Sequence, residues 1–253
     1  MNIAVITGAS SGLGVEYVKA IAEKYPHLDE IWIMARRYDR LAELANQILN
    51  VNCRVIDCDI TEPSAMTHYK EMLSEFDANV KILVNNAGFG KLGLFEDIST
   101  EDNAGMIRLN CEAVTVMTSI TLPFMKAGGE IINICSIASF APNTRMAVYC
   151  STKAYIMSFS RALRVELKKR NINVLAVCPG PMDTEFLPVA NIAPGVSRTF
   201  DTLPRDKATD VARKSLIASE KGKAVYANQF FYKFYRVLSK ILPHSIVMKM
   251  SAT

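Results

Sequence analysis

The sequence lacks the features that mark a metal centre, a disulfide scaffold or a membrane span. Its six cysteines are scattered, with no CxxC pair and no Cys/His spacing typical of zinc. We therefore expect reduced thiols in the core and no bound metal. No stretch of roughly eighteen uninterrupted apolar residues occurs, and the first residues lack a basic region followed by a long apolar one. We expect a cytoplasmic protein that is neither exported nor membrane-spanning.

A strong charge of either sign is also missing. The chain has 29 Lys and Arg against 25 Asp and Glu, a formal net charge of +4, and so small an excess favours solubility over binding to an anionic polymer. Nucleic acid is therefore not an expected partner. Low-complexity linkers, internal repeats and breaks in composition are absent as well. Residues 1–253 are therefore expected to form a single domain.

Short β-branched runs alternate with longer amphipathic stretches along the chain. This alternation is typical of βαβ units and of a parallel sheet covered on both faces. It predicts an α/β fold, with a doubly wound parallel seven-stranded sheet and helices on both faces. The strands are expected at 3–6, 31–34, 54–56, 81–84, 130–134, 173–177 and 224–226, and the helices at 12–24, 39–49, 63–76, 101–125, 149–169 and 207–220.

A glycine-rich turn links the first strand to the first helix. Residues 7–14 read TGASSGLG, and such glycines let a pyrophosphate approach the free N–H groups and positive end of a helix. The spacing differs from GxGxxG and lacks the Gly-Lys-Ser/Thr ending of a P-loop, which disfavours a nucleoside triphosphatase. A plain strand-to-helix turn is the alternative interpretation.

The end of the second strand predicts the type of dinucleotide. Ala35 stands where an acid would bind a ribose 2′-hydroxyl, and Arg36 and Arg37 follow it. Guanidinium groups match a 2′-phosphate, so NADP is expected rather than NAD. The alternative is a solvated basic helix start beside Asp39.

Tyr149 and Lys153 lie four residues apart on one face of an expected helix. A nearby cation lowers the pKa of a tyrosine from about 10, and a value near 7 requires about 4 kcal/mol. An exposed pair supplies less than about 1 kcal/mol, so the pair must lie in a poorly solvated cleft, helped by an oxidised nicotinamide. Because YxxxK is common by chance, a solvated helix face remains the alternative.

Other polar residues gather at the carboxyl edge of the expected sheet, where open α/β folds bind ligands. Ser136 follows the fifth strand, and residues 85–88, Asn-Asn-Ala-Gly, end the fourth. Asn110 lies inside a long expected helix, where an amide is a poor helix former. These positions add weight to the Tyr149–Lys153 pair.

The sequence resembles the short-chain dehydrogenase/reductase family over essentially its whole length. The matching motifs, in order, are Thr7-Gly8-xxx-Gly12-x-Gly14, Asp59, Asn85-Asn86-Ala87-Gly88, Asn110, Ser136, Tyr149-xxx-Lys153 and Pro179-Gly180-x-Met182-x-Thr184. Arg36 and Arg37 match the NADP-preferring branch. Met182 in place of the more usual Val, and Cys150 after the tyrosine, depart from the pattern without threatening activity. The resemblance implies a Rossmann-like fold.

The resemblance also implies roles for these residues. Tyr149 would be the general acid/base, Ser136 would polarise the carbonyl oxygen, and Lys153 would hold the nicotinamide ribose and lower the Tyr149 pKa. Asn110 would orient a water that links Lys153 to solvent. Tyr149 and Lys153 are also cofactor contacts, and the further cofactor-binding residues would be Gly8, Ser10, Ser11, Gly12, Leu13, Gly14, Arg36, Arg37, Asp59, Ile60, Asn86, Ala87, Gly88, Pro179, Gly180, Met182 and Thr184.

The expected activity is NADP(H)-dependent interconversion of a ketone and a secondary alcohol. Residues 181–205, rich in proline, are expected to form a substrate lid. The expected lining favours an apolar substrate such as a 3-oxoacyl thioester or a hydroxysteroid-like compound, and consists of Phe89, Phe140, Ala141, Pro142, Met146, Phe186, Leu187, Pro188 and Val189. Lys91, Arg145 and Arg205 are candidates for an anionic substrate tail. The alternative function is a non-catalytic NADP(H)-binding redox sensor or regulatory protein.

Residues 228–253 form a basic amphipathic segment. From residue 225 onward the chain has no acidic residue, whereas Lys233, Arg236, Lys240 and Lys249 are basic. Three interpretations stay open: a subunit interface or pocket cover, a weak membrane-surface contact, and a solvated helix. Since the family is commonly oligomeric, a homodimer or homotetramer is expected.

Overall fold

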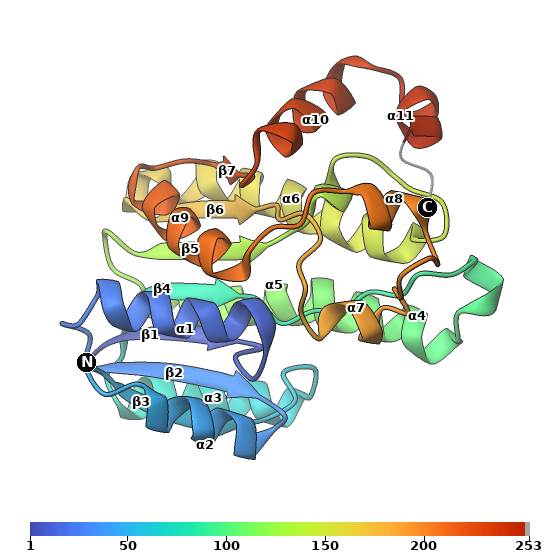
Figure 1. Ribbon diagram of the computed structural model, residues 1–253. Helices are drawn as coiled ribbons and strands as arrows, with labels where there is room; N and C mark the ends of the chain where they lie inside the picture. The colour runs from blue at the N-terminus through green and yellow to red at the C-terminus, as the bar shows by residue number, and fades with distance from the viewer. Residues whose placement is uncertain (251–253) are drawn as a thin grey trace.

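The computed structural model describes residues 1–250 and shows one α/β domain built on a single seven-stranded sheet (Figure 1). The strand order is β3-β2-β1-β4-β5-β6-β7, and every neighbouring pair is parallel. The expected fold class is therefore confirmed. The strands are β1 (Asn2–Thr7), β2 (Glu30–Ala35), β3 (Asn52–Asp57), β4 (Asn79–Asn85), β5 (Glu130–Ile134), β6 (Asn173–Val177) and β7 (Val225–Tyr226).

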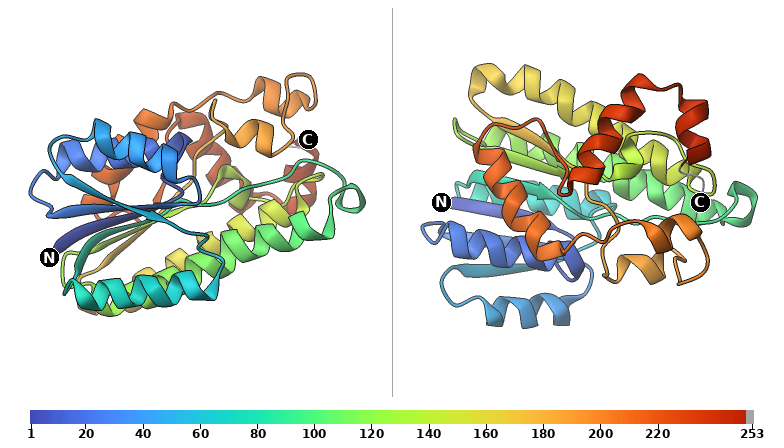
Figure 2. Two further views of the ribbon diagram at one scale, coloured as in Figure 1. Left: turned by 90° about the horizontal axis from the view of Figure 1, so that it is seen from below. Right: turned by 45° about the horizontal axis from the view of Figure 1, so that its top comes forward.

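Helices cover both faces of the sheet, as Figure 2 shows edge-on. On one face lie α1 (Gly12–Lys24), α2 (Tyr38–Gln47) and α9 (Ala208–Glu220), and on the other lie α3 (Pro63–Glu75), α5 (Val114–Thr121) and α6 (Ala147–Glu166). Strand residues serve the two layers alternately, because successive side chains point to opposite faces. In β1, for example, Ala4 and Ile6 pack into the first layer, whereas Ile3 and Val5 pack into the second.

The helix expected over residues 101–125 is wrong as a single element. The chain instead forms α4 (Thr100–Ile107), a π-helical stretch η2 (Arg108–Ala113), α5 and a 3-10 turn η3 (Leu122–Phe124). Apolar spacing cannot separate these, because a π-turn inserts one extra residue without breaking the buried stripe. Such π-turns are frequent at functional sites. The remaining 3-10 turns are η1 (Phe95–Asp97), η4 (Ile137–Ser139) and η5 (Leu167–Arg170).

The expected lid, 181–205, is less irregular than its prolines suggest. It contains two short helices, α7 (Phe186–Val189) and α8 (Arg198–Thr202). Ala190 and Ile192 are buried in a cluster with Tyr149. Just beyond its end, Asp206 accepts a hydrogen bond from the Gly180 N–H at 2.8 Å. The segment is therefore packed against the domain.

The C-terminal segment forms α10 (Phe230–Ile241) and α11 (His244–Met250), separated near Pro243. Residues 251–253 of the expected amphipathic segment lie outside the described residues. Tyr232 is buried under α10 and donates a hydrogen bond to the Pro204 carbonyl at the end of the lid. Within residues 1–250, no helix is long and apolar enough to cross a bilayer.

The six cysteines are all free thiols. Cys135, Cys150 and Cys178 are buried, as expected of core residues. The other three, Cys53, Cys58 and Cys111, are only half-buried, so the expectation of core thiols is correct for half of them. Burial raises the pKa of the Cys150 thiol to about 11, which keeps it protonated at neutral pH.

Candidate active site

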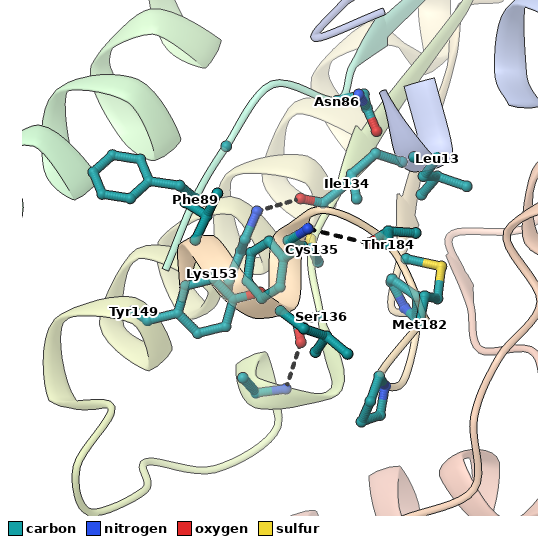
Figure 3. Close-up of a pocket in the computed structure, with 18 of the residues that line it drawn as sticks. Leu13, Asn86, Phe89, Ile134, Cys135, Ser136, Tyr149, Lys153, Met182 and Thr184 are labelled. Atoms are coloured by element: carbon teal, nitrogen blue, oxygen red, sulfur yellow. Dashed lines mark hydrogen bonds between the residues drawn. The ribbon is translucent and has the colours of Figure 1, made fainter. Parts of the chain in front are cut away.

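A cavity of about 1270 Å³ opens along the carboxyl ends of the central strands. β1 and β4 are neighbours here, and the strand order reverses between them. Ligands of open α/β sheets bind at such a switch point. Figure 3 shows Ser136, Tyr149 and Lys153 around one part of this cavity, with Asn86 and Leu13 farther along it.

The glycine-rich turn has the backbone shape that the sequence predicts. Gly8 and Gly12 have φ angles of 66° and 53°, a left-handed region that favours glycine. A Cβ on Gly14 would lie 2.2 Å from the Gly8 carbonyl oxygen. Gly14 does not line the cavity, and its part is to let α1 pack closely on the turn.

Asn86 fastens this turn to the loop after β4. Its Nδ2 donates to the carbonyl oxygens of Thr7 and Gly8 at 3.0 and 3.1 Å. In return, Thr7 Oγ1 accepts from the backbone N–H groups of Asn86 and Ala87, both at 3.1 Å. Two loops that the sequence places about eighty residues apart therefore form one rigid wall of the cavity.

Tyr149 and Lys153 lie side by side on α6, and both are almost fully buried, with exposed fractions of 7% and 5%. Lys153 Nζ lies 5.8 Å from the centroid of the Tyr149 ring and donates a hydrogen bond to the Ile134 carbonyl at 2.8 Å. Ser136 lies just past β5, and its Oγ accepts from the Ala138 N–H at 3.1 Å. The Ser136 hydroxyl also lies within hydrogen-bond reach of Tyr149.

The expected lowering of the Tyr149 pKa is wrong for the protein alone. Burial raises the pKa of Tyr149 above its ordinary value, and a hydrogen bond with Ser136 acts in the opposite direction without reversing the shift. Burial likewise lowers the pKa of Lys153. Loss of water disfavours the charged form of each group, and this is the largest cause of both shifts. The cleft therefore holds a neutral phenol at neutral pH.

Asn110 lies in the π-helical stretch η2, behind the cavity wall, with an exposed fraction of 1%. Its Nδ2 donates to the Phe89 carbonyl at 2.8 Å and to Thr152 Oγ1 at 3.0 Å, and its Oδ1 accepts from the Phe89 N–H at 3.0 Å. Asn110 thus joins the loop after β4 to α6. A carbonyl oxygen can accept two hydrogen bonds, so Oδ1 keeps one free position.

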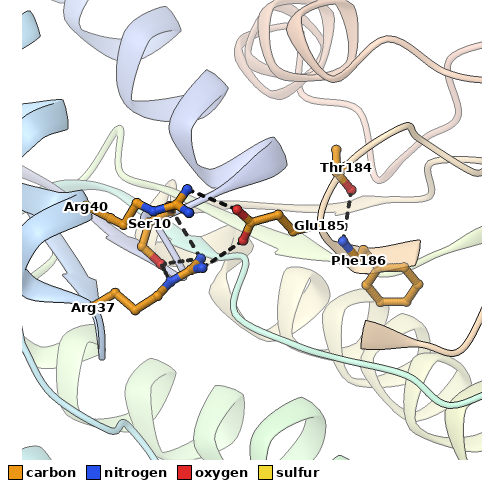
Figure 4. A network of polar contacts seen from close by, with 6 residues as sticks. All are labelled: Ser10, Arg37, Arg40, Thr184, Glu185 and Phe186. Carbon is orange, nitrogen blue, oxygen red and sulfur yellow. Dashed lines mark hydrogen bonds and ion pairs between the residues drawn. The ribbon is translucent and has the colours of Figure 1, made fainter. Parts of the chain in front are cut away.

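The expected adenosine end contains more charge than the sequence indicated. Arg36 pairs with Asp59 at 3.6 Å. Arg37 donates from Nε and Nη2 to Ser10 Oγ, at 3.3 and 3.1 Å. Two residues that the sequence reasoning missed join it, Arg40 on α2 and Glu185 on the lid (Figure 4). Arg40 could have been found from the sequence, because it lies one helical turn after Arg37. Glu185 could not, because it is 148 residues away from Arg37.

The wall around Tyr149 is mainly apolar. Of the residues expected there, the cavity is lined by Phe89, Ala141, Met146, Phe186, Leu187 and Val189. Phe140, Pro142 and Pro188 do not line it, and the Phe140 ring instead contacts Tyr235 at 5.9 Å. Gly90, also missed, lets its loop pass the Tyr149 ring, since a Cβ there would lie 2.7 Å from a ring carbon.

The helix α10 also lines the cavity, as does one of the three basic residues expected to bind an anionic substrate tail. From α10 come Phe231, Tyr232, Phe234, Tyr235 and Leu238, so one face of this helix covers the cavity. Lys91 lines the cavity and pairs with Asp102 at 3.4 Å. Arg145 and Arg205 do not line it: Arg145 donates to the Val196 carbonyl, and Arg205 pairs with Asp183.

Residues 2–194 match the family model described as short chain dehydrogenase. The chain therefore belongs to the short-chain dehydrogenase family. It is an oxidoreductase of the kind that acts on CH–OH groups. It is similar to the NADP-dependent 3-hydroxy acid dehydrogenase of Schizosaccharomyces pombe, at 32% identity over 189 residues, which make up 72% of each chain.

Two solved structures show the same architecture. A short-chain dehydrogenase from Sphingobium yanoikuyae in complex with NADPH superposes with a TM-score of 0.79 at 27% identity, over 96% of this chain and 97% of that one. The 3-ketoacyl-(acyl-carrier-protein) reductase of Brucella melitensis complexed with NADH superposes with a TM-score of 0.76 at 25% identity, over 89% and 95%. Both nicotinamide cofactors thus occur among similar proteins.

Proposed function

We propose that the protein is an NADP(H)-dependent oxidoreductase that interconverts a ketone and a secondary alcohol on a fairly apolar substrate. The observation that carries this proposal is a buried Tyr149–Lys153 pair beside Ser136, in an apolar cavity that continues to the glycine-rich turn. Substrates of the 3-oxoacyl thioester or hydroxysteroid type suit this lining. The 3-hydroxy acid dehydrogenase and the ketoacyl reductase to which the chain is similar act on related groups.

The residues of the turn and the adenosine end fit a phosphorylated dinucleotide. Gly8 and Gly12 give the turn its left-handed backbone. The helix α1 begins at Gly12 beside the cavity, so its positive end and first N–H groups can bind a pyrophosphate. Arg37 donates to Ser10, and Arg37 and Arg40 meet at Glu185, whereas Arg36 lies beside Asp59. Guanidinium forks of this kind bind phosphate oxygens in pairs. When bound, NADPH would supply the hydride.

The side chains around the carbonyl group would then handle the proton. Tyr149, kept neutral by burial, donates its proton to the forming alkoxide. Ser136 donates a hydrogen bond to the same oxygen and stabilises the charge that develops on it. Lys153, between the Ile134 carbonyl and Tyr149, binds the nicotinamide ribose. Asn110 positions the loop of Phe89 and α6 around this group.

The test is nicotinamide absorbance with the purified protein, NADPH or NADH, and a panel of 3-oxoacyl thioesters, keto-steroids and simple apolar ketones. Turnover with one class and a lower KM for NADPH supports the proposal. Faster turnover with NADH would overturn the cofactor preference. Tight NADPH binding without turnover across the panel would favour the second candidate, a redox sensor or regulatory protein.

The outward face of α10 leads us to propose a partner as well. Phe230 is 82% exposed, and Val237 and Ile241 are also exposed, beside the basic residues of a segment without acidic ones. We propose that this face is a contact of a homodimer or homotetramer in the cytoplasm, where free thiols persist; a weak membrane-surface contact is the alternative.

A double variant, Phe230→Ser with Ile241→Ser, tests the two alternatives. Its control is Leu49→Ser, because Leu49 is 92% exposed in the loop after α2. The subunit contact predicts that only the double variant becomes monomeric by light scattering. If the wild type is a monomer that floats with vesicles of anionic lipid, and the double variant does not float, the membrane contact is correct instead.

A further inference from the structure

A carboxylate of the lid occupies the guanidinium groups at the adenosine end of the cavity. Glu185 Oε2 accepts from Arg37 Nη1 at 2.8 Å, and Glu185 Oε1 accepts from Arg40 Nη1 at 3.0 Å (Figure 4). Both carboxylate oxygens are thus held by donors from the loop after β2 and the start of α2. We call this contact of Glu185 with Arg37 and Arg40 the lid clamp.

The lid clamp uses the chemistry that a phosphate monoester would use. A ribose 2′-phosphate is an anion bound by guanidinium forks and hydroxyl groups. Arg37 and Arg40 are the donors that meet here, and the Ser10 hydroxyl, which accepts from Arg37, lies beside them. Both a phosphate and the Glu185 carboxylate need the Nη groups of the two arginines. Two like charges held at the same donors repel one another, so they compete.

The lid clamp is also linked to the substrate end of the cavity. Glu185 lies between Thr184, which contacts Gly12 of the glycine-rich turn, and Phe186, the first residue of α7. The Phe186 ring lies 5.7 Å from the Tyr149 ring, centroid to centroid, and Leu187 lines the same wall. A shift of Glu185 therefore moves the chain beside the candidate catalytic tyrosine.

We propose that Glu185 is a built-in competitor for the 2′-phosphate of NADP(H), and that displacing it frees α7. NAD(H), which lacks this phosphate, leaves the lid clamp closed. Glu185 thereby makes the position of the substrate wall depend on which dinucleotide is bound. The proposal rests on the cofactor preference proposed above.

Removing the charge of Glu185 should strengthen the binding of the phosphorylated cofactor alone. We expect Glu185→Gln to lower the Kd of NADPH by about three- to tenfold, since exposed ion pairs contribute up to roughly fivefold each to an equilibrium. The Kd of NADH should stay within about twofold. Fluorescence titration of the reduced cofactors measures both constants.

Asp183→Asn is the matched control, because it removes the same charge two residues away on the same lid. Asp183 pairs with Arg205 at 3.7 Å and makes no contact with Arg37 or Arg40. A general electrostatic effect would strengthen NADPH binding equally in both variants and would overturn the proposal. Unchanged or weaker NADPH binding in Glu185→Gln would also overturn it, the latter by showing that Glu185 orients the arginines for phosphate.

A second measurement follows the lid itself by hydrogen exchange at the backbone amides of Phe186, Leu187, Val189 and Ala190. Adenosine 2′,5′-bisphosphate should speed exchange there in the wild type, whereas adenosine 5′-monophosphate should not. In Glu185→Gln, exchange should be fast without either compound. Equal effects of the two compounds would overturn the link to the lid.

The two proposals fail separately. The ratio of the wild-type Kd values for NADPH and NADH tests the cofactor preference. The ratio of the NADPH Kd values of Glu185→Gln and the wild type tests the lid clamp.

Discussion

Replacing Asn110 by Ala should destabilise the domain and weaken the site together. The Asn110 side chain is 1% exposed and makes three hydrogen bonds, two with the Phe89 backbone and one with Thr152. Each buried group left without a partner costs about 1–3 kcal/mol, and partial relaxation or water entry reduces the sum. We expect a loss of about 2–4 kcal/mol in the free energy of unfolding.

For a domain of this size that loss lowers the Tm by about 4–16 °C, at roughly 2–4 °C per kcal/mol. Thermal unfolding followed by circular dichroism measures it. Activity below the transition should fall as well, because Gly88 and the Phe89 loop pack against the Asn110 amide.

Asn103→Ala serves as the control, since Asn103 lies on α4 of the same helical stretch and donates only one hydrogen bond, to Ile98 at 3.2 Å. It should cost less than about 1.5 kcal/mol. If Asn110→Ala unfolds at the same temperature as the wild type and as Asn103→Ala, the reasoning that Asn110 joins the two walls is refuted.

Three further predictions concern the cofactor, the proton and the glycine-rich turn. Replacing Arg37 and Arg40 together by Met should raise the KM for NADPH by about 10- to 100-fold, since charged hydrogen bonds contribute about 1.5–3 kcal/mol. The KM for NADH should stay almost unchanged. Steady-state kinetics with both cofactors measure the two KM values. Alcohol oxidation requires the Tyr149 phenolate, and burial raises the pKa at which this phenolate forms. The kcat/KM for oxidation should therefore rise by about tenfold per pH unit up to that pKa. A flat profile from neutral to alkaline pH would show that another group accepts the proton. Gly14→Ala would place a Cβ 2.2 Å from the Gly8 carbonyl, so it should lower stability by more than about 2 kcal/mol and abolish NADPH binding, which calorimetry can check.

Much of the fold could be predicted because strands buried on both faces leave a simple pattern. The run Ile3–Ile6 is apolar at every position, since its side chains enter both layers. Likewise, the turn at Gly8 and Gly12 needs left-handed backbone, and glycine supplies it at low cost. Such requirements depend only on neighbouring residues, so the sequence alone can predict them.

What could not be predicted depends on partners distant in sequence. Glu185 reaches Arg37 across 148 positions, and no local pattern records that contact. The Tyr149 pKa was misjudged because the sequence shows the spacing to Lys153 but not the desolvation by the surrounding wall, which is the largest cause of the shift. The sequence also does not show that α10 covers the cavity, because this depends on where the chain packs after β7.

The central claim is that Tyr149 supplies the proton of a ketone reduction, and Tyr149→Phe tests it most directly. Tyr155→Phe is the control, because Tyr155 lies on the same helix, is 43% exposed and shares a hydrogen bond with Thr115. For a ketone that the wild type reduces with NADPH, Tyr149→Phe should lower kcat by about 10²- to 10⁴-fold with the Kd of NADPH unchanged, and Tyr155→Phe should match the wild type. A Tyr149→Phe variant that keeps the wild-type kcat would contradict the account.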